Sequence, residues 1–101
     1  MVDTQTVRAR LDDGRDDWTL LDVREIGEVE DASIAAARHI YLGHLNEEWQ
    51  ELDKDRAYTL MCASGKRATV AAGWLASKGF EKLDIYLGSM GAWQASQDQR
   101  D

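Results

Sequence analysis

The stretch "LMCASGKRATVAAGWL", residues 60–75, contains the only cysteine of this 101-residue chain. It begins at the end of an apolar run and continues into a segment in which Val70, Ala71 and Trp74 recur with helical spacing. Gly79 follows as a candidate helix C-cap. A buried strand, a tight loop and a helix are therefore expected in succession, with the thiol at the point where the strand ends.

The same alternation of strand and helix extends outward from this stretch. Strand-like runs occupy residues 17–23, 38–43, 56–62 and 82–88. Helical or short helical segments are expected at 6–14, 25–34, 44–52 and 67–78, and a closing helix begins at residue 90. Strands that alternate with helices predict an α/β fold with a parallel sheet and helices on both faces. Ligands bind beyond the carboxyl ends of strands in such sheets, which is where Cys62 falls.

Length and charge limit the classes of function. The chain is 44% hydrophobic and 31% charged, which predicts one soluble domain over residues 1–101. A net charge of −7 argues against nucleic acid and anionic membrane surfaces as partners. That charge is interpreted as a solubility feature, with an acidic binding face as the alternative. A single cysteine cannot form an internal disulfide, and no stretch approaches the ~20 apolar residues of a membrane span, so a reducing, cytoplasmic location is expected.

The residues after Cys62 suit an anionic sulfur. The candidate loop comprises Ala63, Ser64, Gly65, Lys66 and Arg67. Its small residues allow the backbone N–H groups to curl into a nest, and the helix that follows presents the positive end of its dipole. Two cations and these N–H groups would lower the pKa of the thiol. The alternative is that Cys62 is a small buried core residue, which would leave the small residues and the two cations unexplained.

Four motifs resemble those of single-domain rhodaneses in order and spacing. They are "LLDVRE" at 20–25, "CASGKRA" at 62–68, "GF" at 79–80 and "LGSMGAW" at 87–93. The resemblance covers nearly the whole chain. It implies a central, mainly parallel sheet of about five strands flanked by helices on both faces.

The resemblance also implies an activity. Cys62 would carry sulfur as a persulfide, taken from thiosulfate or another donor and passed to cyanide, a thiol or a partner protein. The loop from Ala63 to Arg67 would hold the persulfide and the sulfonate of the donor. A monomer without metal or organic cofactor is expected. Because the chain has no second cysteine, the acceptor must be external.

Two other functions remain open at this point. Phosphatases and arsenate reductases of the same fold carry five residues between the cysteine and the arginine, whereas four separate Cys62 from Arg67. That shorter loop favours sulfur over a tetrahedral phosphate. A non-catalytic binding module of the family would usually lack the cysteine.

Further residues have weaker assignments. Asp22 and Arg24 match the motif at the end of the first core strand, where they would either orient the loop or form a scaffold ion pair. His39 and His44 are interpreted as surface or packing residues, because no second cysteine or acidic cluster supports a metal. The sequence departs from the family pattern mainly between residues 26 and 37, where it lacks the prolines that are usual in the family.

Overall fold

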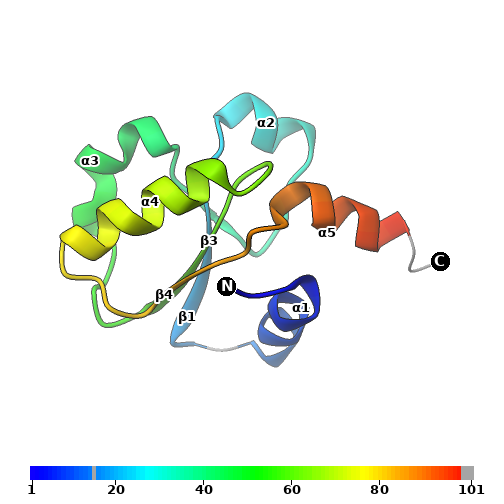
Figure 1. Ribbon diagram of the computed structural model, residues 1–101, viewed down its shortest axis with the longest axis horizontal. Coiled ribbons are helices and arrows are strands. Elements are labelled where there is room, and N and C mark those ends of the chain that lie inside the picture. The colour runs from blue at the N-terminus through cyan, green and yellow to red at the C-terminus, as the bar shows by residue number, and fades with distance from the viewer. Residues whose placement is uncertain (15, 99–101) are drawn as a thin grey trace.

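Four parallel strands form the sheet of this protein, whose computed structural model describes residues 1–14 and 16–98 (Figure 1). The strands are β1 (Trp18–Asp22), β2 (Arg38–His39), β3 (Ala57–Met61) and β4 (Leu83–Ile85). They lie in the order β2-β1-β3-β4, and every pair is parallel. The local patterns predicted four strands and the family resemblance about five, and the described part of the chain contains four. Val2 adds an isolated parallel bridge to Tyr86.

The described part of the chain contains five α-helices. They are α1 (Thr4–Asp13), α2 (Ile26–Asp31), α3 (Leu45–Glu48), α4 (Lys66–Ser77) and α5 (Ser89–Asp98). The single helix predicted over 44–52 is instead a short α3 flanked by the 3₁₀ turns η1 (Leu42–His44) and η2 (Trp49–Glu51). Leu45 and Leu52 of this segment are buried. None of the described helices is long and apolar enough to cross a membrane.

Successive side chains of the central strands supply two separate cores. Leu21 of β1 and Leu60 of β3 pack under α3 and α4, whereas Leu20 and Met61 pack under α1 and α5. This alternation follows from the two-residue period of a strand, and it places helices on both faces, as predicted. Figure 1 shows α3 and α4 on one side of the strands and α1 and α5 on the other. The segment after β3 therefore leaves the sheet where both helical layers can contact it.

Candidate active site

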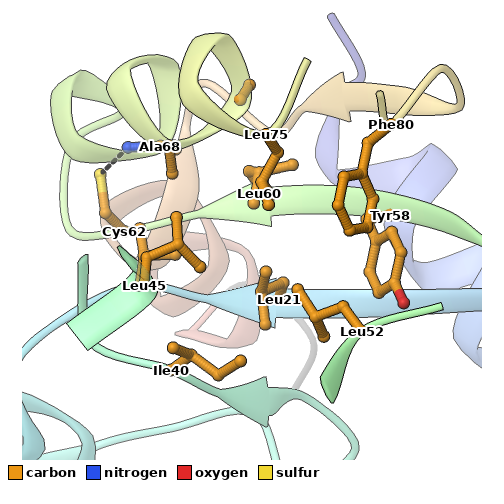
Figure 2. Close-up of a cluster of buried hydrophobic side chains, with 13 residues drawn as sticks. Leu21, Ile40, Leu45, Leu52, Tyr58, Leu60, Cys62, Ala68, Leu75 and Phe80 are labelled. Atoms are coloured by element: carbon orange, nitrogen blue, oxygen red, sulfur yellow. Dashed lines mark hydrogen bonds between the residues drawn. The ribbon is translucent and has the colours of Figure 1, made fainter. Parts of the chain in front are cut away.

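Cys62 follows β3 directly, and its side chain turns toward the core formed with α3 and α4. The residue is only 1% exposed. Its Sγ accepts hydrogen bonds from the backbone N–H groups of Gly65, at 3.0 Å, and Ala68, at 3.4 Å. Figure 2 shows the second of these bonds, with Leu45 beside the thiol. The sulfur therefore lies between apolar side chains of the core and the backbone N–H donors of the loop.

Two opposing effects act on the pKa of the Cys62 thiol. Burial alone would raise it, because desolvation disfavours a charged sulfur. Backbone N–H groups of Ala68, Ser64, Gly65 and Arg67 act against burial, and the net result is a pKa below the ordinary thiol value. The thiolate is the nucleophilic form of cysteine, so this environment favours reactivity over an inert packing role.

A pH profile of alkylation measures this effect directly. The rate of iodoacetamide addition follows the thiolate fraction, so it should rise with pH and level off at a lower pH in the folded protein than in the same chain unfolded in urea. The chain's single cysteine makes the signal unambiguous. Coincident profiles for the folded and unfolded chain would show that the loop leaves the thiol unactivated.

Gly65 makes the tight turn of the loop possible. It precedes α4 with a φ of 100°, a left-handed conformation that side chains rarely adopt. A Cβ at this position would also lie 2.7 Å from the carbonyl oxygen of Leu87. The turn at Gly65 brings the N–H groups of Gly65 and Ala68 to the sulfur of Cys62, and any larger residue at position 65 would strain it.

The start of α5 holds the other side of the loop. The Oγ of Ser89 accepts a hydrogen bond from the Cys62 N–H at 3.1 Å. Met90 N–H donates to the Cys62 carbonyl and Gly91 N–H to the Ala63 carbonyl, at 3.0 and 3.3 Å. Sequence reasoning missed this role of Ser89, although a serine ahead of a helical segment is a recognisable signal for backbone hydrogen bonding.

The two cations of the loop have different surroundings. Lys66 is exposed at the first residue of α4. Arg67 reaches across to α2, where Nη1 and Nη2 contact Oε1 and Oε2 of Glu28 at 2.6 and 2.9 Å. Glu28, 39 residues away in the chain, was not anticipated from the sequence.

Asp22 and Arg24 form a buried ion pair beyond the end of β1. Arg24 Nη2 lies 2.7 Å from Asp22 Oδ2, and the two residues are 3% and 1% exposed. The same guanidinium donates to the carbonyls of Glu28 and Ala32, at the end of α2. These contacts match the scaffold alternative, in which the pair ties β1 to α2. Asp22 pairs in register with Met61, so the pair lies one residue from the thiol on the adjacent strand.

The two histidines have local partners. His39 Nε2 lies 2.5 Å from the carbonyl oxygen of Arg24, and His44 Nδ1 lies 3.9 Å from Glu48 on the next helical turn. Among residues 1–14 and 16–98, no three histidine, cysteine or acidic side chains gather as a metal site would require. Met90 and Trp93 are buried in the core under α1 and α5, as packing residues.

Comparisons with known proteins agree with this geometry. Residues 3–96 match the family model described as "Rhodanese-like domain". The chain is 39% identical over 75 residues to the Bacillus subtilis protein named "Putative sulfurtransferase YtwF", covering 74% of this chain and 72% of that one. It is 27% identical over 85 residues to the thiosulfate sulfurtransferase GlpE of Coxiella burnetii, covering 84% and 79%. The crystal structure of the single-domain sulfurtransferase RDL2 of Saccharomyces cerevisiae superposes with a TM-score of 0.84 at 26% identity, covering 98% and 91%.

Proposed function

Because this chain belongs to the family of rhodanese-like domains, we propose that it moves sulfane sulfur from a small donor to an external thiophile through a persulfide on Cys62. The observation that carries the proposal is the thiol itself, directed at backbone N–H groups at the carboxyl end of β3. A cysteine that only filled the core would need no such donors. The residues of the loop, from Ala63 to Arg67, form the binding site in this proposal.

The first half of the reaction loads the cysteine. The Cys62 thiolate attacks the outer sulfur of thiosulfate, a new S–S bond forms, and sulfite leaves with the electron pair of the old S–S bond. Charge is conserved, because the thiolate becomes a persulfide anion and a dianion is exchanged for a dianion. The N–H groups of Gly65 and Ala68 face the reacting sulfur and stabilise negative charge there.

The second half returns the thiolate. Cyanide or a thiolate attacks the outer sulfur of the persulfide and departs as thiocyanate or as a new persulfide. No internal thiol can compete, because Cys62 is the only cysteine in the chain. Covalent transfer in two steps predicts ping-pong kinetics, with an external small thiol, cyanide or partner protein as the second substrate.

Intact-mass measurement tests the proposal. The reduced protein is incubated with thiosulfate, freed of donor, weighed, and weighed again after addition of cyanide. We expect a gain of one sulfur atom that cyanide removes, because the persulfide is the obligate intermediate. Prior alkylation of Cys62 is the matched control and should prevent the gain. If thiosulfate and other sulfane donors all leave the mass unchanged while the thiol still alkylates, the domain is a binding module instead.

A further inference from the structure

The charge of Arg67 in the loop is neutralised by a carboxylate of α2. Arg67 and Glu28 form a bidentate ion pair, the geometry in which a guanidinium binds a carboxylate most strongly. Glu25, at the N-terminus of the same helix, also acts electrostatically on Arg67. The positive charge of Arg67 is thus balanced by the carboxylate of Glu28, in a chain whose net charge is −7.

Glu28 is held firmly in this position. The Glu25 N–H donates to Glu28 Oε1 at 3.2 Å, forming a capping box at the start of α2. Arg24 donates to the Glu28 carbonyl from the buried side. The hydrogen bond from Arg67 lowers the pKa of Glu28 to about 2, so the carboxylate is ionised throughout the physiological range. Glu28 therefore carries its negative charge beside Arg67 at physiological pH.

Arg67 lies in the loop between Gly65 and Ala68, whose backbone N–H groups both contact the sulfur of Cys62. The hydrogen bond to Glu28 raises the pKa of the Arg67 guanidinium, and the charge of the Cys62 thiolate adds to this rise. A donor approaching Cys62 consequently meets the field of the whole Glu28–Arg67 pair. A pair without net charge attracts a dianion far less than a free guanidinium does.

We propose that the Glu28–Arg67 ion pair sets the donor preference of Cys62, disfavouring dianionic thiosulfate and favouring sulfane-sulfur donors of lower negative charge, such as thiosulfonates. This inference rests on the proposed persulfide chemistry and specifies its substrate class. Glu28 acts here through Arg67 and the local field, as a positioning residue for charge. The transfer step is unchanged, because a thiosulfonate releases a sulfinate where thiosulfate releases sulfite.

Two matched donors separate charge from chemistry. Thiosulfate carries two negative charges, and methanethiosulfonate replaces one oxyanion with a methyl group and carries one. Suppose that a variant changes the electrostatic potential at Cys62. The factor by which it changes the loading rate constant for the dianion is then the square of the factor for the monoanion. The ratio of the two rate constants for loading Cys62 therefore reports the local charge, and an altered pKa of the thiol cancels from it.

The wild type, the two single variants and the double variant of Glu28 and Arg67 form a charge series for this measurement. Glu28→Gln should raise kcat/KM for thiosulfate roughly tenfold and for methanethiosulfonate about threefold, mainly through KM, because it leaves Arg67 unneutralised. Arg67→Met should shift the ratio of the two donors about threefold in the opposite direction. The double variant should return to the wild-type ratio. Glu30→Gln, an exposed charge change on the same helix, is the control and should leave the ratio unchanged.

Salt dependence supplies a second test. Added salt should reduce the gain that Glu28→Gln gives with thiosulfate more than its gain with methanethiosulfonate, because screening weakens the attraction of the unpaired Arg67 in proportion to donor charge. Two results would overturn the inference and leave the pair a structural role. In one, the ratio of the thiosulfate to the methanethiosulfonate rate constant is the same in all four proteins. In the other, this ratio falls in both the Glu28 and the Arg67 variant. If neither donor adds sulfur to the wild-type Cys62, the proposed function fails and this inference fails with it.

Discussion

Replacing Cys62 with serine should abolish sulfur transfer, with kcat/KM from thiosulfate to cyanide falling by roughly 10³-fold or more. A serine hydroxyl is not ionised near neutral pH, and an oxygen in place of the sulfur cannot form the persulfide. The N–H groups of Gly65 and Ala68 would remain in place without a thiolate to stabilise. Thiocyanate production measures the loss.

The same variant should keep its fold. Serine is close to cysteine in size, and its hydroxyl can accept the hydrogen bond that Gly65 donates. Thermal unfolding and circular dichroism near those of the wild type are therefore expected alongside the lost activity. Transfer at more than about a hundredth of the wild-type rate would contradict the assignment of Cys62 as nucleophile.

Replacing Arg24 with methionine should have the largest effect on stability, a loss of about 3–5 kcal/mol in the free energy of unfolding. The change leaves the carboxylate of Asp22, which is 1% exposed, without its buried partner. It also removes the donors to the carbonyls of Glu28 and Ala32, which hold α2 against β1. Urea denaturation, with the midpoint and slope fitted together, measures the change.

A second variant and a control separate a scaffold role from a catalytic one. The double change Asp22→Asn with Arg24→Met removes the orphaned charge and should recover part of the lost stability. Arg38→Met, an exposed arginine on β2, should change stability by less than about 0.5 kcal/mol. If Arg24→Met lowers transfer in proportion to the folded fraction only, Arg24 is a scaffold residue. A loss of transfer in molecules that remain folded would instead assign it to the loop.

Much of the fold follows from local sequence patterns. The predicted strands at 17–23 and 56–62 match β1 and β3 to within one residue at each end, because strands buried on both faces are almost continuously apolar. β2 was predicted over 38–43 but covers only Arg38–His39, since the chain turns into η1 at Leu42. The local patterns predicted four strands, and the figure of about five came from the family resemblance alone.

The candidate site also has one part that could be predicted from the sequence and one part that could not. The loop from Cys62 to Arg67 could be predicted, because its turn, its small residues and the helix start are adjacent in the chain. The partners of that loop could not. Ser89 lies 27 residues from Cys62 and Glu28 lies 39 from Arg67, and only the tertiary fold brings them together. Polar contacts of this range leave no periodic signal in a single sequence.

The anchoring of the loop from two sides has a consequence for how the motif can be reused. Gly65 and Ala68 approach the sulfur from α4, and Ser89 and Met90 hold the Cys62 backbone from α5, on the opposite face of the sheet. Residues 62–68 in a linear peptide would lack these constraints and carry an ordinary thiol. Grafting this chemistry onto another scaffold would require transplanting the strand and both helix starts as one unit.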